Sequence, residues 1–378
     1  MAAAARKPVP DADFQPLRAI GLMSGTSMDG VDAAYVETDG ARAIVRGETL
    51  TTPFGRDFRA RLKAYILTDP VRDGGPAEKA FEAELTDLHV KAVRALAARL
   101  GKDLSEIDIV GFHGQTIWHK PAQRLTWQMG DGAALARALG VPVAYDFRGD
   151  DVRAGGQGAP LLPIFHAALA PPSQEPIVIL NVGGVGNITW MRGGDADFEG
   201  LLGFDTGPGN GLVDDWVMKH FDMPMDSGGA IAARGRVHED IVEAMLRAPF
   251  FARKPPKSLD RFEFSTQPVD HLSPEDGAAT LTAFTAACVV QGLTHCPAKP
   301  SRIFVAGGGR HNETLMQMLA QRAGVVVASV DALGWQGDAL EAQAFAYFAV
   351  RTSRGLPLTF PGTTGIAAPL NGGKIARP

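Results

Sequence analysis

Residues 19–37, AIGLMSGTSMDGVDAAYVE, contain the pattern that decides the fold. Two apolar runs, Ile20 to Met23 and Val31 to Val36, flank a segment of small and hydroxyl-bearing residues. The Asp29–Gly30 pair between apolar runs is typical of a β-hairpin. The stretch therefore predicts two strands joined by a loop rich in Gly, Ser and Thr. Such a loop offers backbone N–H groups and hydroxyls that suit a phosphate, although an ordinary hairpin with a polar tip fits the same pattern.

The composition is ordinary for a soluble globular protein, with 45% hydrophobic and 21% charged residues. A length of 378 residues predicts two to three domains. The formal net charge of −5 supplies no basic excess to neutralise phosphates, which argues against a nucleic-acid partner or an anionic membrane surface. The two cysteines, Cys288 and Cys296, argue against a disulfide framework and a cysteine-based zinc site.

No segment has the apolar length of a signal peptide or a membrane span, so a cytoplasmic location is the expectation. Residues 1–17 are expected to form a loose tail. A homodimer is the default expectation for the oligomeric state.

A second strand–turn–strand pattern begins at Ile177, in IVILNVGGVGNITWM, and repeats the first. Strands and helices predicted by periodicity and by Gly and Pro boundaries follow each hairpin. The repetition predicts an α/β fold of two similar lobes with a ligand cleft between them. We place lobe I at residues 1–152 and lobe II at 153–351, and we expect residues 352–378 to return to lobe I.

Asp205, in GFDTGPGN, is the carboxylate that we expect to perform acid–base chemistry. It follows the apolar segment Leu201–Phe204 at a predicted strand end, and the glycines beside it leave room for a substrate. A carboxylate there can take a proton from a hydroxyl or water while a phosphate is transferred. A turn-capping role before a helix near Asn210 fits as well. No GxxxxGK[ST] motif is present, and the Gly184–Gly186 pattern lies between two strands, which argues against a dinucleotide site.

Polar or glycine-rich segments at other strand ends complete the candidate site. The HGQT motif, His113 to Thr116, suits a polyhydroxylated ligand, although a satisfied polar turn fits equally well. Arg148 can bind a carboxylate or phosphate with two hydrogen bonds, or form a structural pair with Asp151. Gly307–Gly309 leaves space for a flat ring such as adenine. Glu341 opens a predicted helix, where a solvated surface position is the common alternative.

Taken together, these motifs resemble those of the anhydro-N-acetylmuramic acid kinases. The shared segments are GLMSGTSMDGVD, GFHGQTIWH, YDFRGDDVRAGGQGAPL, LNVGGVGNITW, GFDTGPGN, RKPPKSL and GGGRHN, in the same order from about residue 17 to the C-terminus. The resemblance implies an actin-like (ribonuclease H-like) fold of two lobes. It also implies an enzyme that uses ATP and Mg²⁺ to hydrolyse the 1,6-anhydro bond of the sugar and phosphorylate O6. The products would be N-acetylmuramic acid 6-phosphate and ADP, in the recycling of cell-wall sugars.

The resemblance also assigns roles to residues. Asp205 would be the base that activates water for attack at the anomeric carbon, and Arg148 would pair with the lactyl carboxylate of the sugar. The ATP-binding residues would be Gly25, Thr26, Ser27, Met28, Asp29, Gly30, Val31, Asp32, Gly183, Gly184, Asn187, Gly307, Gly308 and Gly309. The substrate-binding residues would be His113, Gln115, Thr116, Arg148, Asp205 and Glu341. Met23 stands where many actin-like ATPases carry a magnesium-positioning Asp, so the magnesium ligands stay open among Asp29, Asp32, Asp205 and Glu341.

Three other functions compete with this one. A kinase of the same fold could take another anhydro sugar, and a nucleotide-switched binding protein could use the same phosphate loops. A plain glycosidase would need two acids on either side of one bond and would have no use for paired phosphate loops.

Overall fold

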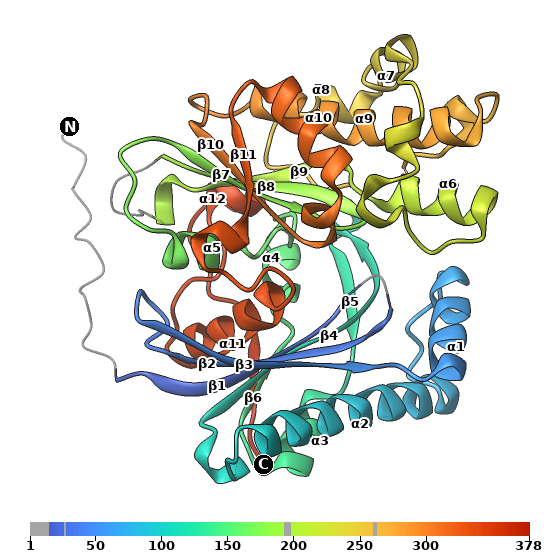
Figure 1. Cartoon of the computed structure of the whole chain (residues 1–378). Helices are drawn as coiled ribbons and strands as arrows, with labels where there is room; N and C mark the ends of the chain where they lie inside the picture. Colours follow the sequence, from blue (N-terminus) through green and yellow to red (C-terminus); the bar gives the residue numbers. More distant parts are fainter. Residues whose placement is uncertain (1–14, 26–27, 193–197, 260–262) are drawn as a thin grey trace.

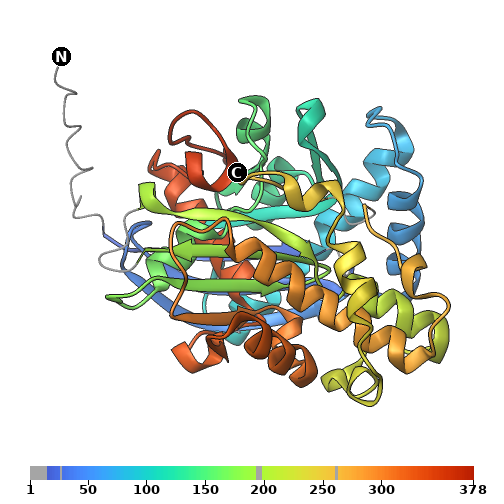
Figure 2. The same cartoon turned by 90° about the horizontal axis from the view of Figure 1, so that it is seen from above.

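The computed structural model describes residues 15–25, 28–192, 198–259 and 263–378, and shows two β-sheets, one in each lobe. Each sheet contains one of the predicted hairpins. Most of residues 1–17, and Thr26 and Ser27 of the predicted phosphate loop, lie outside the described residues. The second sheet, with its helices, lies over the first when the molecule is seen from above (Figure 2).

The first sheet has seven strands in the order β12-β6-β4-β1-β2-β3, with β5 paired to β4. The antiparallel pair β1 and β2 is the predicted hairpin, and Met23 lies opposite Asp32. β4 runs parallel to β1 and β6 runs parallel to β4. The strand bounds are β1 Leu17–Ser24, β2 Gly30–Thr38, β3 Ile44–Pro53, β4 Ile109–Lys120, β5 Leu125–Met129, β6 Val143–Tyr145 and β12 Lys374–Ala376.

Helices cover both faces of this sheet (Figure 1). α1 (Arg56–Leu67), α2 (Pro76–Arg99) and α3 (Gly132–Leu139) lie on one face, where they bury a core with the first hairpin. α11 (Leu340–Ser353) lies on the other face, in contact with β1, β2 and β4. The predicted lobe boundary placed the segment of α11 in lobe II. Because α11 packs against the first sheet, we propose a lobe boundary that places it with lobe I.

Two glycines allow α11 to approach the first sheet. A Cβ atom at Gly21 of β1 would overlap the carbonyl oxygen of Ala342, and one at Gly111 of β4 would overlap that of Phe345. A side chain at either position would force the helix away from the sheet. The close contact also sets the position of Glu341, in the first turn of α11.

The second sheet has five strands in the order β11-β10-β7-β8-β9. β7 and β8 form the second predicted hairpin. Side chains of β7 alternate between two cores, as expected for a strand buried on both faces: Val178 and Leu180 pack on the outer face, whereas Ile177 and Ile179 face the interior between the lobes. The strand bounds are β7 Ile177–Val182, β8 Val185–Met191, β9 Leu202–Pro208, β10 Arg302–Ala306 and β11 Val326–Ser329.

The remaining helices surround the second sheet or connect the lobes (Figures 1 and 2). Their bounds are α4 Gly149–Arg153, α5 Pro163–Leu169, α6 Gly211–Phe221, α7 Glu239–Met245, α8 Pro249–Ala252, α9 Pro274–Leu293, α10 Glu313–Ala323 and α12 Pro361–Thr364. The C-terminal segment contacts both lobes, because α12 lies against β9 and β12 pairs with β6. A core shared by both lobes joins α5 and α11 to the inner faces of the two sheets.

Two predicted strand ends are wrong. The HGQT motif and Asp205 were expected to follow strands, but both lie inside them, in β4 and β9. β4 continues to Lys120 because its second half pairs with β5, after a register irregularity near Gly114, where φ is 74°. β9 continues to Pro208 because β8 pairs with it over that length.

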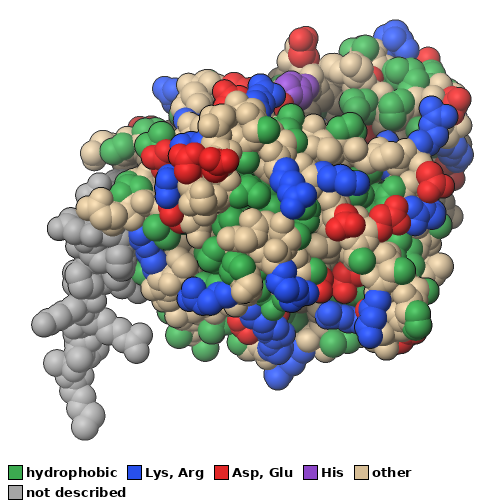
Figure 3. Space-filling model, turned by 90° about the horizontal axis from the view of Figure 1, so that it is seen from below, with side chains coloured by type: hydrophobic (Ala, Val, Ile, Leu, Met, Phe, Trp, Pro, Cys, Tyr) green, Lys and Arg blue, Asp and Glu red, His purple; other side chains and the backbone are tan. Residues whose placement is uncertain are grey.

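None of the helices in the described ranges is both long and apolar enough to cross a membrane. Lys and Arg side chains alternate with Asp and Glu on the face shown in Figure 3, with no continuous basic surface on that face.

Candidate active site

Asp205 is a buried carboxylate with one direct backbone donor. Its side chain is 8% exposed, and the Leu259 N–H donates to its Oδ2 at 2.8 Å. Burial raises the pKa of Asp205 from 3.8 to about 7, while the Leu259 hydrogen bond and the positive charges of Arg148 and Lys257 act in the opposite direction. A carboxylate with this pKa can accept a proton near neutral pH and release it again.

A strap formed by Lys257, Ser258 and Leu259 holds Asp205 along its backbone. The Asp205 N–H donates to the Lys257 carbonyl oxygen at 2.9 Å, in addition to the Leu259 bond. The Lys257 ammonium is buried, lies 4.3 Å from the Phe250 ring centroid and donates to the Phe250 carbonyl oxygen at 3.2 Å. Burial lowers the pKa of Lys257. The predicted site omitted the strap, although its motif RKPPKSL carried part of the family resemblance.

Arg148 and His113 form the second part of the site. Arg148 Nε donates to His113 Nε2 at 3.1 Å, and Nη1 donates to the Gly158 carbonyl oxygen at 2.8 Å. His113 Nδ1 lies 2.8 Å from the Gly114 carbonyl oxygen, so Nδ1 carries the proton and Nε2 accepts. Burial and the Arg148 charge hold the pKa of His113 well below its ordinary value, so the ring is neutral. The alternative Arg148–Asp151 pair is not made; Asp151 instead accepts from the Gly158 N–H and the Thr364 hydroxyl.

Two further carboxylates lie within electrostatic range. Burial raises the pKa of Glu341. The positive charge of Arg148 opposes this rise, and the negative charge of Asp32 adds to it. Burial also raises the pKa of Asp32, with Asp29 and Asp338 adding to the shift and a 2.5 Å hydrogen bond from the Thr51 hydroxyl opposing it. Glu341 is therefore not the solvated surface residue that the sequence left as an alternative.

The loop of the first hairpin is anchored on β4. Gln115 Nε2 donates to the Gly25 carbonyl oxygen at 3.2 Å, and the Ser24 hydroxyl donates to the Gly114 carbonyl oxygen at 3.2 Å. Met28 has a left-handed backbone, with φ 54°, and its N–H donates to the Gly25 carbonyl oxygen. Gln115 is fully buried, and its hydrogen bond to Gly25 supports the loop in this structure.

Other residues predicted for the two ligands lie in different surroundings. Val31 is fully buried in the lobe I core, and a Cβ at Gly30 would overlap the neighbouring strand β3. Asp29 is exposed at the hairpin. The Thr116 hydroxyl accepts a long hydrogen bond from Gln128 of β5, at 3.4 Å, rather than joining Arg148 and Asp205.

The two glycine turns of lobe II lie side by side. A Cβ at Gly307, where φ is 73°, would lie 2.7 Å from the Val182 carbonyl oxygen, just before the Gly183–Gly184 turn. That turn accepts hydrogen bonds from the N–H groups of Asn210 and Gly211 at the start of α6. Gly184 has open space where a side chain would be, a Cβ at Gly308 would make an ordinary contact with Asn210 Nδ2 at 3.8 Å, and a Cβ at Gly309 would meet Val182. Asn187, on β8, lies opposite Asp205 of β9.

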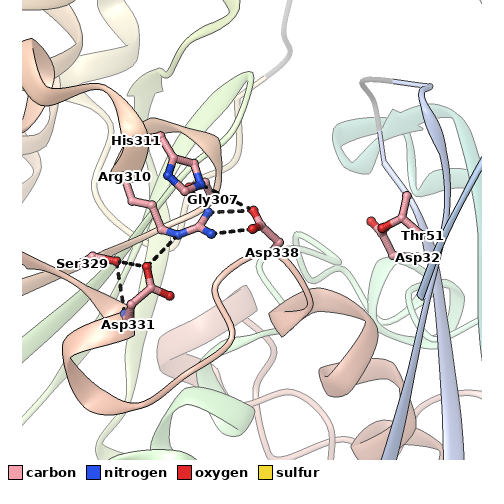
Figure 4. Close-up of polar contacts among 8 residues, drawn as sticks. All are labelled: Asp32, Thr51, Gly307, Arg310, His311, Ser329, Asp331 and Asp338. Carbon is pink, nitrogen blue, oxygen red and sulfur yellow. Dashed lines mark hydrogen bonds and ion pairs between the residues drawn. The ribbon is translucent and has the colours of Figure 1, made fainter. Parts of the chain in front are cut away.

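Arg310 organises the Gly307 turn and was absent from the predicted site (Figure 4). Its buried guanidinium donates to the Gly307 carbonyl oxygen at 3.0 Å, to both carboxylate oxygens of Asp338 at 2.8 and 2.6 Å, and to Asp331 at 3.2 Å. Asp338 lies between Arg310 and the Asp32 of lobe I in this view, so the turn faces the first hairpin. The GGGRHN motif contained this arginine, but its partners are 21 and 28 residues away in sequence.

The structure thus brings Asp205, Arg148, His113 and Glu341 into one cluster, with Asp32 at its edge. The glycine turns of lobe II form a separate group, near Asp338 and Arg310. A buried base within electrostatic range of an arginine suits proton transfer on a ligand that carries a negative charge, and the separate glycine turns suit phosphate binding.

Comparison with known proteins identifies the family of this chain. A family model described as "Anhydro-N-acetylmuramic acid kinase" matches residues 17–377. A protein of that name from Rhizorhabdus wittichii is 52% identical over 363 residues, covering 95% of this chain and 99% of its own. Proteins of that name from Rhodospirillum rubrum and Acidiphilium cryptum are 51% and 49% identical, covering 94% and 96% of this chain and 93% and 99% of their own.

Among solved structures, the activator of the 2-hydroxyisocaproyl-CoA dehydratase from Clostridium difficile with bound ADPNP aligns with a TM-score of 0.46 at 12% identity. The alignment covers 90% of this chain and 96% of that one. The sequence matches span almost the whole chain at about half identity, and they show that the chain belongs to the anhydro-N-acetylmuramic acid kinase family.

Proposed function

We propose that this protein uses ATP to open the 1,6-anhydro bond of anhydro-N-acetylmuramic acid and to phosphorylate O6 in one coupled reaction. The products are N-acetylmuramic acid 6-phosphate and ADP. The observation that carries the proposal is Asp205, a buried carboxylate with a pKa of about 7 beside Arg148, in a chain of this family.

In the proposed reaction, Asp205 accepts a proton from a water molecule as the water oxygen bonds to C1 of the sugar. The C1–O6 bond breaks, and its electron pair stays on O6. O6 then attacks the γ-phosphorus of ATP, and the bond to the ADP oxygen breaks. Asp205 afterwards returns its proton to solvent, which its pKa near 7 permits. Holding the water, the sugar and ATP together converts an unfavourable encounter of three molecules into a reaction within one complex.

Arg148 is the proposed partner of the lactyl carboxylate. Its Nε and Nη1 are fixed by His113 and Gly158, which orients the guanidinium and leaves Nη2 for a ligand. Neutral His113 adds no second positive charge, so the subsite is selective for one negative charge. Asp205 and Glu341 both lie within electrostatic range of Arg148 and keep the buried guanidinium charged despite the desolvation that lowers its pKa.

For ATP we propose the Gly25–Asp32 loop of lobe I and the turns at Gly183–Gly184 and Gly307–Gly309 of lobe II. The open space at Gly184 supports this assignment, because phosphates and a flat base need close approach to the backbone. The described part of the chain contains no group of three or more His, Cys, Asp or Glu arranged to hold a metal ion. This fits Mg²⁺, which is commonly held by substrate phosphates and one or two carboxylates.

Asp32 is the carboxylate that we propose for the magnesium ion, because it is half-buried and faces lobe II (Figure 4). A bound Mg²⁺ would neutralise charge on the phosphates. Exposed Asp29 is the second candidate from the same loop. Asp205 and Glu341 surround Arg148 and are assigned to the sugar instead.

The test is product stoichiometry with ATP, Mg²⁺ and the anhydro sugar. We expect ADP and sugar 6-phosphate in equal amounts, and little ADP without the sugar. ATP hydrolysis that does not respond to the sugar would favour a nucleotide-switched binding protein. Sugar opening without ATP would favour a glycosidase.

The variant Arg148→Ala distinguishes the proposed function from that of a kinase for another anhydro sugar. The proposal predicts a loss of about 100-fold in kcat/KM with the muramyl substrate, as expected for a charged hydrogen bond, and a much smaller loss with an analogue that lacks the lactyl group. Any general disturbance of His113 or Gly158 affects both substrates, so the ratio of the two losses isolates the carboxylate. Equal losses would remove Arg148 as the lactyl partner.

A further inference from the structure

A side-chain hydrogen bond joins the strap that holds Asp205 to the segment that holds Arg148. The Ser258 hydroxyl donates to Gln157 Oε1 at 2.9 Å, across 101 residues of sequence. Ser258 lies between Lys257 and Leu259, whose backbone groups make the two hydrogen bonds to Asp205. Neither Ser258 nor Gln157 was among the predicted site residues.

Gln157 is itself fixed from two sides. Its N–H donates at 2.7 Å to the carbonyl oxygen of Thr364, the last residue of α12, and its own carbonyl oxygen accepts from His119 Nε2 of β4 at 2.8 Å. The next residue, Gly158, accepts from Arg148 Nη1 at 2.8 Å. Gln157 is therefore a fixed point, one residue from the carbonyl that orients Arg148.

We propose that the Ser258–Gln157 hydrogen bond sets the position of Asp205 relative to Arg148, so that the base and the anion-binding guanidinium keep a fixed distance and orientation. Ser258 and Gln157 are thus positioning residues that act through Asp205. This inference rests on the proposed function, because it assumes that Asp205 and Arg148 act on the same ligand. The physical reason is that a base misplaced by less than an ångström loses much of its rate advantage.

The charges that face Asp205 come from two elements. Arg148 lies at the start of α4 and Lys257 lies on the strap, while the charge of Glu341 of α11 acts on Arg148. Removal of the Ser258 hydroxyl changes none of these charges. It frees the strap to move, and the Leu259 N–H then donates less well to the carboxylate.

The test compares Ser258→Ala, Gln157→Ala and the double variant, with Ser258→Thr retaining the hydroxyl. We expect each single variant to lower kcat about tenfold, as for one lost hydrogen bond, with the KM for ATP within about twofold of wild type. The double variant should lose no more than either single variant, because the two residues act through one contact. Ser258→Thr should restore most of the rate. Ser301→Ala is the matched control, since its hydroxyl bonds the Pro176 carbonyl oxygen elsewhere in lobe II.

A readout without turnover separates failure of this inference from failure of the proposed function. The pH dependence of unfolding, measured as the difference from Asp205→Asn in the same background, reports the pKa of Asp205 alone. Ser258→Ala should move that midpoint to higher pH, because the Leu259 hydrogen bond favours the ionised carboxylate. An unchanged midpoint, or additive losses of kcat in the double variant, would overturn the positioning role even if the kinase reaction is confirmed. If wild type shows no kinase reaction, the midpoint shift still decides whether the contact positions Asp205.

Discussion

Asp205→Asn should make the protein more stable at alkaline pH, although it removes the proposed base. Burial raises the pKa of Asp205 from 3.8 to about 7, so the folded protein binds this proton more tightly than the unfolded chain does. Between these two values the unfolded state is ionised and the native state is protonated. The native state therefore loses stability relative to the unfolded state as the pH rises through this window.

The size of the effect follows from the separation of the two pKa values. A difference of about three units corresponds to about 4 kcal/mol at a pH above both values, at about 1.4 kcal/mol per unit. The neutral amide of Asn avoids this cost, and its oxygen can still accept from the Leu259 N–H. Relative to the variant, wild type should lose roughly 3 kcal/mol of unfolding free energy between about pH 4.5 and about pH 8.5.

The assay is urea unfolding of both proteins at several pH values, with the difference in unfolding free energy plotted against pH. Groups that titrate identically in both proteins cancel in this difference. The account predicts a curve that rises in favour of Asn up to about pH 7 and is then flat. Two parallel stability profiles would show that Asp205 has an ordinary pKa in the folded protein, and the argument for a base near neutrality would fail.

Two further predictions concern the surroundings of the base and the contact between helix and sheet. Lys257→Met removes a buried positive charge that lowers the pKa of Asp205, so the acidic limb of the rate profile should move to higher pH; Lys219→Met, at an exposed lysine that also lies over an aromatic ring, should leave it in place. Gly21→Ala forces a Cβ onto the backbone of α11 and should cost about 3 kcal/mol in urea unfolding. Gly55→Ala, in open space, should change stability by less than about 0.5 kcal/mol. Unshifted limbs in both lysine variants, or equal stabilities in both glycine variants, would contradict these predictions.

Much of the fold was predictable because the pattern is local. Apolar runs on both sides of a glycine turn identified both hairpins, and helical periodicity with Gly and Pro boundaries located α2 and α9. The position of α11 was not predictable in this way. Its contact with the first sheet depends on Gly21 and Gly111, which are more than 200 residues earlier in the chain.

The candidate site was likewise predictable only in part. Asp205 and Arg148 were predicted from residue type and from motifs shared with the family, and Glu341 from its place at the start of a helix. The structure places both carboxylates within electrostatic range of Arg148. The strap at Lys257–Leu259 was not identified, because a backbone N–H that bonds a carboxylate leaves no signature in the side-chain pattern. The same holds for Arg310, whose partners come from a distant segment.

A reaction with ATP, Mg²⁺ and the anhydro sugar in ¹⁸O-labelled water tests whether water opens the anhydro bond as O6 is phosphorylated. We expect ¹⁸O at C1 and phosphate at O6 of the sugar product, and neither sugar phosphate nor ADP from Asp205→Asn. An unlabelled C1 would contradict hydrolytic opening of the anhydro bond. Substantial turnover by Asp205→Asn would contradict the role of this carboxylate as the base.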